Sequence, residues 1–232
     1  MKADEVVREL RSMARPENVE GMARFGINPQ NTLGIGIPRL RSMAKRLGDD
    51  HKLALELWAS GIHEARLLAG FIDDPAMVTD EQMEAWAAEF DSWDVVDQVC
   101  SNLFDQTPFA YAKAVEWSGR KEEFVKRAGF VLIASLSVHD KAAPDKKFQR
   151  FFPIIKREAS DERNFVKKAV NWALRQIGKR NAALNMAAIR LANDIQRIDS
   201  RSARWIAADA LRELTSENVK RRLTARPRRP GA

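Results

Sequence analysis

The fold is read most directly from the stretch at residues 90–104, Phe90-Asp91-Ser92-Trp93-Asp94-Val95-Val96-Asp97-Gln98-Val99-Cys100-Ser101-Asn102-Leu103-Phe104. Ser92 is a favoured residue type at a helix N-cap, and Phe90 lies where a hydrophobic staple would meet Val96. From Trp93 onward apolar residues recur at helical spacing. The pattern predicts a helix from Trp93 to Phe104 with one apolar face, on which Cys100 is a small buried residue.

Asp97 lies in that apolar stripe, one turn after Trp93. An ionised carboxylate is costly to bury without a partner. Either a cation neutralises Asp97 or its side chain faces a cleft. The structural alternative is a core Trp followed by an Asp that complements the helix dipole.

The rest of the chain repeats this helical pattern. The predicted helices cover residues 4–14, 17–25, 38–47, 52–60, 63–72, 80–90, 93–104, 108–118, 122–137, 145–158, 161–179, 181–193 and 200–215. Short breaks rich in Gly, Pro, Asp and Ser separate them, and no segment alternates with the period of a strand. The sequence therefore predicts an all-α solenoid of paired antiparallel helices, with a unit of roughly 35 to 45 residues and a concave surface along which DNA could lie.

Composition excludes several classes of protein. Of 232 residues, 45% are hydrophobic and 31% charged, as in ordinary globular proteins. There is no apolar run of membrane-spanning length and no signal peptide, which predicts a cytoplasmic protein. One cysteine and three scattered histidines argue against a disulfide or a metal site, and nothing indicates a cofactor. A monomer is the default expectation.

The net charge of +7 is unevenly distributed. Residues 1–120 hold 13 basic and 20 acidic residues, and residues 121–232 hold 26 and 12. A strongly basic C-terminal half favours a polyanionic partner, with nucleic acid preferred over a membrane. We expect a single domain at residues 1–218 and a basic, disordered tail at residues 219–232, whose affinity would be nonspecific.

The predicted helix at 161–179 carries two stripes. The core stripe is Val166, Val170, Ala173, Leu174 and Ile177, and the second stripe is Lys168, Trp172, Arg175 and Lys179. An indole flanked by cations favours an exposed surface that could meet a sugar-phosphate backbone. Arg127 interrupts another apolar helix, and its structural alternative is an ion pair to a neighbouring helix, with Asp97 as one candidate partner.

Four motifs together resemble the AlkD family of DNA alkylation repair glycosylases. They are Trp93 with Asp97 four residues on, Lys126-Arg127-Ala128, Asn171-Trp172-Ala173-Leu174-Arg175, and the N-terminal pair Phe25-Gly26-Ile27 and Ile37-Pro38-Arg39-Leu40-Arg41-Ser42-Met43-Ala44-Lys45. The likeness runs from about residue 20 to residue 215, in the same order and with similar helix spacing. The basic tail is outside it.

The resemblance implies a right-handed solenoid of HEAT-like repeats that cradles duplex DNA. The implied activity is that of a monofunctional 3-methyladenine/7-methylguanine DNA glycosylase, which hydrolyses the N-glycosidic bond of cationic N3- or N7-alkylated purines without flipping the base into a pocket. By position, Asp97, Trp93 and Trp172 take the catalytic roles. Arg127, Arg175, Lys168 and Lys179 are the implied DNA contacts.

The chemistry agrees with that assignment, since a cationic purine is already a good leaving group and one carboxylate could stabilise the sugar it leaves behind. A second hypothesis is a helical-repeat module that binds DNA structure or a protein partner without catalysis. A carboxylate in a DNA-facing cleft would repel phosphate in such a module, which favours the enzyme.

Overall fold

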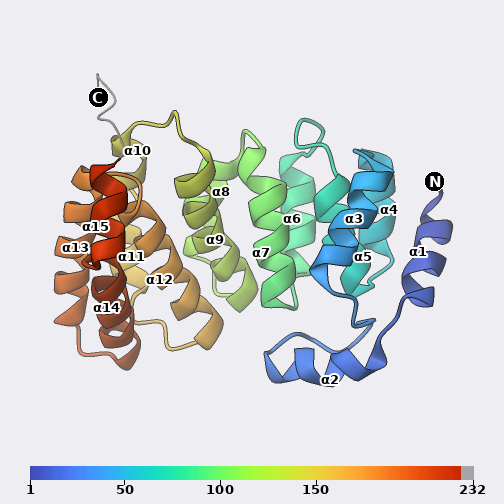
Figure 1. The fold of residues 1–232 in the computed structure, drawn as a ribbon, viewed down its shortest axis with the longest axis horizontal. Helices are drawn as coiled ribbons and strands as arrows, with labels where there is room; N and C mark the ends of the chain where they lie inside the picture. Colours follow the sequence, from blue (N-terminus) through green and yellow to red (C-terminus); the bar gives the residue numbers. More distant parts are fainter. Residues whose placement is uncertain (226–232) are drawn as a thin grey trace. The chain divides into compact units, whose positions relative to one another are not determined.

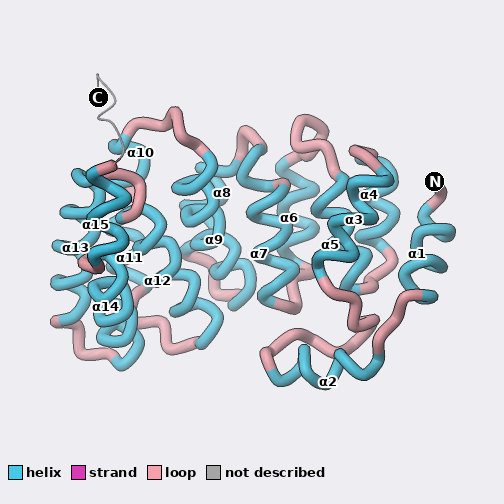
Figure 2. The backbone as a smooth tube through the Cα atoms, viewed as in Figure 1, coloured by secondary structure: helices cyan, strands magenta, loops and turns pink. Residues whose placement is uncertain are grey.

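The computed structural model describes residues 1–225, and within that range every regular element is a helix (Figure 2). The all-α prediction is confirmed. The chain divides into two compact units, one at Met1–Ala110 and one that begins at Tyr111. We describe each unit by itself, and the single domain predicted at residues 1–218 stays a prediction.

The first unit is built from seven α-helices and a short 3-10 turn (Figure 1). They are α1 (Ala3–Ser12), α2 (Pro16–Arg24), α3 (Ile37–Leu47), α4 (His51–Ala59), α5 (His63–Ile72), α6 (Asp80–Ala88), α7 (Trp93–Asn102) and η1 (Phe104–Gln106). Helix α5 packs against α3, α4 and α7. Gly70 permits the close approach of α5 to α7, because a Cβ there would lie 2.9 Å from a Val99 methyl carbon.

The second unit holds eight α-helices among the described residues, the first of which begins at the boundary residue Ala110. They are α8 (Ala110–Ser118), α9 (Glu123–His139), α10 (Asp145–Gln149), α11 (Phe152–Glu158), α12 (Asn164–Gly178), α13 (Ala182–Gln196), α14 (Arg201–Leu214) and α15 (Glu217–Thr224). Helix α12 packs between α9 and α14 and also contacts α13. Helix α12 is therefore the centre of this unit.

Two predicted boundaries are wrong. The helix predicted at 145–158 is broken into α10 and α11, because Pro153 lacks a backbone donor and lies in the first turn of α11. Helix α15 occupies residues for which the sequence predicts a disordered tail. The Ser216 hydroxyl accepts a hydrogen bond from the Val219 backbone N–H and caps this helix, and Val219 is buried. The remainder of the predicted tail, residues 226–232, lies outside the described residues.

Within residues 1–225 no helix is long and apolar enough to cross a membrane.

Candidate functional site

Helix α7 begins at Trp93, as the sequence predicts, and its first turn is bound to a distant loop. The Ser92 hydroxyl accepts a hydrogen bond from the Asn28 backbone N–H at 2.8 Å. The Asn28 side chain in turn donates to a carboxylate oxygen of Asp91, also at 2.8 Å. The indole Nε1 of Trp93 donates to the Phe25 carbonyl at 3.0 Å. These bonds join residues about sixty positions apart and hold the indole in place.

The buried and exposed faces of α7 differ from the prediction. Val95, Val96, Val99 and Cys100 are buried, whereas Trp93, Asp97, Gln98 and Asn102 are only partly buried. Cys100 is confirmed as a small core residue. The prediction that Asp97 lies on the buried face is wrong. That prediction takes Trp93 as part of the core, but the Trp93 Nε1–H donates a hydrogen bond and the indole lies at the edge of the core. Asp97 therefore lies on the same partly exposed side of α7 as Trp93, one turn later.

Glu64 on α5 is a fully buried carboxylate that the sequence reasoning missed. One of its oxygens accepts hydrogen bonds from the backbone N–H groups of Gly34 and Ile35, at 2.7 and 3.0 Å, and the other accepts from Leu33 at 2.8 Å. Gly34 adopts a φ of +80°, and a Cβ there would meet the Arg15 carbonyl oxygen at 2.1 Å. Glu64 thus fixes the loop that leads into α3. The signal in the sequence is an acidic residue among the apolar residues of α5.

His63 and Asp94 form a buried pair between α5 and α7, also missed. Their closest atoms, Nε2 and a carboxylate oxygen, lie 2.9 Å apart. Burial of the His63 ring acts to lower its pKa, but the hydrogen bond to Asp94 and the negative charges of Asp94, Glu64 and Asp91 outweigh burial and hold the pKa above its usual value. The hydrogen bond and these charges favour the protonated form of His63. Its partner Asp94 directly follows Trp93 on α7.

This pair makes the stability of the first unit depend on pH. A raised pKa in the folded state contributes stability that is fully present below the unfolded value of 6.5 and is lost as the pH rises through the folded value. We expect the urea midpoint to fall as the pH rises above about 6.5 in the wild type, and to fall less in His63→Gln, whose amide can form a hydrogen bond but does not titrate. Equal pH dependence in both proteins would contradict the assignment.

In the second unit, Arg127 is buried on α9. Its guanidinium Nη1 donates to the backbone carbonyl of Phe165 at 2.7 Å. This bond ties α9 to the first turn of α12.

The predicted stripe on α12 has the expected exposure at its N-terminal end. Lys168 is exposed and Trp172 is partly exposed. Further along, Arg175 and Lys179 each bind Glu213 of α14 at 2.6 Å. Two of the four cations in the predicted DNA-binding set therefore carry a counter-ion within their own unit.

These ion pairs belong to a ladder between α12 and α14 that includes a second indole. The Lys167 ammonium lies 5.5 Å from the centre of the Trp205 ring. One turn on, the Asn171 amide donates to Asp209 at 2.7 Å, and Asp209 lies 3.5 Å from Arg175. The sequence could not show this ladder, since the acidic residues of α14 also fit a solvated face.

Among residues 1–225 no group of three or more His, Cys, Asp or Glu side chains is placed to hold a metal ion. What the two units display is an indole beside a carboxylate on α7, and an indole beside a lysine on α12.

No curated protein sequence matches the chain. A solved structure described as "a new family of proteins related to the HEAT-like repeat DNA glycosylases with affinity for branched DNA structures" matches with a TM-score of 0.76 at 19% identity, over 92% of this chain and 95% of that one. This likeness shows the fold, and the predicted HEAT-like helical repeat is confirmed. A designed armadillo repeat protein in complex with the peptide (KR)4 matches at 14% identity over 80% of this chain and 89% of that one, with a TM-score of only 0.36.

A family model described as "DNA alkylation repair enzyme" matches residues 6–214, which span α7, α9 and α12. That match covers nearly the whole described chain, and so the protein belongs to the family of DNA alkylation repair enzymes.

Proposed function

We propose that this protein is a DNA glycosylase that hydrolyses the N-glycosidic bond of cationic N3- or N7-alkylated purines in duplex DNA, without flipping the base into a pocket. Membership of the DNA alkylation repair family supports repair of alkylated DNA. The observation that carries the specific proposal is Asp97, a carboxylate on the partly exposed side of α7 one turn after Trp93. In this proposal that carboxylate meets the substrate and a water molecule.

The proposed reaction needs one carboxylate. The bond between C1′ and the purine nitrogen breaks, and its electron pair neutralises the positive charge of the base. The sugar that remains resembles an oxocarbenium ion, which Asp97 stabilises while it orients a water molecule. The water oxygen bonds to C1′ and its proton passes to solvent. The indoles of Trp93 and Trp172 add cation-π attraction to the positive charge, worth about 0.5–2 kcal/mol each.

In this proposal the DNA backbone is bound by Lys168, Arg175, Lys179 and Arg127. Lys168 is exposed and has no counter-ion among the described residues. Arg175 and Lys179 share Glu213, so a phosphate must compete with a carboxylate for them. Arg127 is buried, so in this proposal its positive charge attracts the DNA backbone from below the protein surface.

We therefore expect Lys168→Ala to weaken binding to any DNA sequence and to reduce the slope of log affinity against log salt by about one. Lys179→Ala should change both quantities less, because Glu213 already neutralises that ammonium group. Fluorescence anisotropy with two unrelated duplexes over a salt series measures both variants. A larger effect from Lys179→Ala, or an effect of Lys168→Ala on one sequence only, would contradict this account.

A second candidate function is a non-catalytic module that binds DNA structure. The description of the solved neighbour favours it, since that family has affinity for branched DNA. The deciding experiment incubates excess protein with methylated duplex DNA and detects freed 3-methyladenine and 7-methylguanine by chromatography, alongside binding to a four-way junction and a linear duplex. Release of either base supports the glycosylase. Tight junction binding with no base released over a single turnover favours the binding module.

A further inference from the structure

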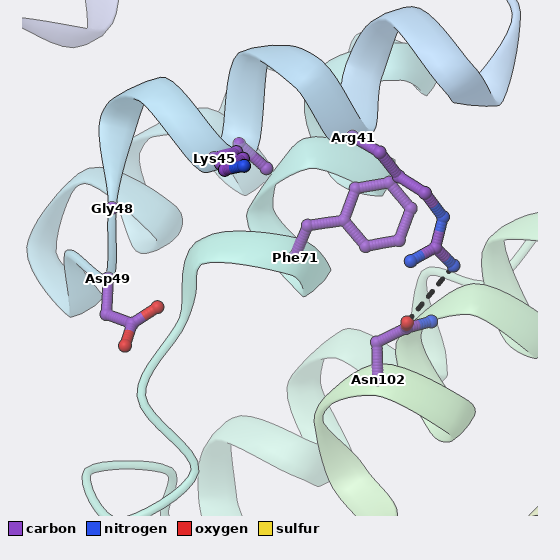
Figure 3. Close-up of a pocket in the computed structure, with 7 residues that line it drawn as sticks. Arg41, Lys45, Gly48, Asp49, Phe71 and Asn102 are labelled. Atoms are coloured by element: carbon purple, nitrogen blue, oxygen red, sulfur yellow. Dashed lines mark hydrogen bonds between the residues drawn. The ribbon is translucent and has the colours of Figure 1, made fainter.

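An open cavity of about 400 Å³, lined by both charged and apolar residues, lies on the first unit between α3, α5 and α7. Its lining includes Arg41, Lys45, Gly48, Asp49, Phe71 and Asn102 (Figure 3). The volume is within the usual range for small-ligand sites. The site described above does not use this cavity.

The guanidinium of Arg41 is held in a fixed position by neutral groups. Its carbon atom lies 4.7 Å from the centre of the Phe71 ring, over which it stacks. Its Nη2 donates to the side-chain oxygens of Gln98 and Asn102 at 3.0 and 3.2 Å, and Figure 3 shows the bond to Asn102. These contacts orient the cation without neutralising it.

Arg41 differs in this respect from Arg46 on the same helix. Arg46, one turn later on α3, binds both carboxylate oxygens of Glu9, at 2.6 and 2.7 Å. Within residues 1–225 neither Arg41 nor Lys45 has a carboxylate partner. The cavity is therefore lined by an oriented guanidinium and by an ammonium group, and both can bind a phosphate group.

Asp49 limits where an anion can sit. Figure 3 shows its carboxylate on the opposite side of the cavity from Arg41. Because the carboxylate repels phosphate, the anion is confined to the side of Arg41 and Asn102. Asp49 can instead accept a hydrogen bond from a sugar or base.

We propose that this cavity binds one phosphate of the DNA strand that carries the modified purine, and so sets the register of the DNA on α7. This proposal rests on the proposed function, which makes duplex DNA the substrate. Asp97 and Trp93 precede Asn102 on the same helix by about 8 and 14 Å at the rise of an α-helix. For a strand that runs along α7, successive phosphates lie about 3.4 Å apart along the duplex axis, which puts the bound phosphate roughly two to four nucleotides from the modified purine. Phosphate contacts of this kind position DNA without reading its sequence.

The test replaces single phosphates by uncharged methylphosphonates along the strand and measures equilibrium binding by the full-length protein. For the wild type we expect one methylphosphonate, about two to four nucleotides from the modified purine, to weaken binding roughly tenfold. Arg41→Ala should weaken binding to the natural duplex to a similar degree and should be insensitive to that methylphosphonate, since the two changes remove the same contact. Lys45→Ala should show the same loss of sensitivity in part.

Arg46→Ala is the matched control, with the same charge removed from the same helix but facing Glu9. It should keep the full response to the methylphosphonate. If the wild type binds duplex DNA and Arg41→Ala responds to every methylphosphonate as the wild type does, the cavity proposal is overturned and the proposed function is untouched. If the wild type binds duplex DNA but releases no base, the glycosylase proposal is overturned. The cavity proposal is then still decided by the methylphosphonate binding measurements. If the wild type binds no duplex at all, both are overturned.

Discussion

Asp97→Asn is expected to slow base release from methylated duplex DNA by about 10²- to 10³-fold, the usual cost of removing one preorganised electrostatic stabiliser of a transition state. Asn has nearly the same shape as Asp but lacks the negative charge that would stabilise the sugar cation and orient water. Because Asp97 lies outside the core, the substitution should leave the fold intact. Duplex affinity should be unchanged or slightly higher, since a carboxylate that repels phosphate is gone.

The measurement is single-turnover release of 7-methylguanine, with binding followed separately on the same duplex. Asp91→Asn is a suitable control: it removes one exposed carboxylate just before α7, and its carbonyl oxygen can still accept the hydrogen bond from Asn28. This control should release base at the wild-type rate. Unchanged release by Asp97→Asn would remove Asp97 from the reaction, and loss of binding together with release would make it a structural residue.

The behaviour of α7 shows what a single sequence can reveal about such a site. Its first residue was predictable, because Ser92 and the spacing of apolar residues are local signals. Its buried face was misplaced because the position of Trp93 depends on a bond to the Phe25 carbonyl, which lies far away in the sequence. The pairing of Asp94 with His63 depends in the same way on how α5 packs against α7. Local periodicity gives the helix, but tertiary contacts decide which of its polar residues are buried.

In helix α12, too, local spacing predicts some features and tertiary contacts decide others. The exposure of Lys168 and the partial exposure of Trp172 follow from the spacing of the core residues on the opposite side of the helix. The ion pairs of Arg175 and Lys179 require the register between α12 and α14, which no local pattern contains. Charge along a sequence therefore overstates the charge available to DNA, because helix packing has already neutralised part of it.

The largest effect on stability is expected from Glu64→Ala. The substitution would leave the backbone N–H groups of Leu33, Gly34 and Ile35 without their acceptor, and those of Gly34 and Ile35 are buried. Each buried donor left unsatisfied costs roughly 1–3 kcal/mol, so we expect the free energy of unfolding of the first unit to fall by about 3 kcal/mol or more. The loop before α3 should loosen as well.

Glu64→Gln should have an intermediate effect. Gly34 and Ile35 donate to the same carboxylate oxygen, and an amide oxygen can accept both bonds. Leu33 donates to the other oxygen, and an amide NH₂ placed there would face a second donor. The expected order of stability is therefore wild type, then Glu64→Gln, then Glu64→Ala.

Urea denaturation followed by circular dichroism measures this order, and amide hydrogen exchange at residues 33–35 locates the effect. Glu56→Ala, which removes an exposed carboxylate from α4, should change neither quantity appreciably. The loop held by Glu64 lies between Asn28, which binds the residues before α7, and Arg41, which lines the cavity. If exchange at residues 33–35 rose in Glu64→Ala while base release and the methylphosphonate response stayed at wild-type levels, the loop would be a stabilising element alone and would not position Trp93 or Arg41.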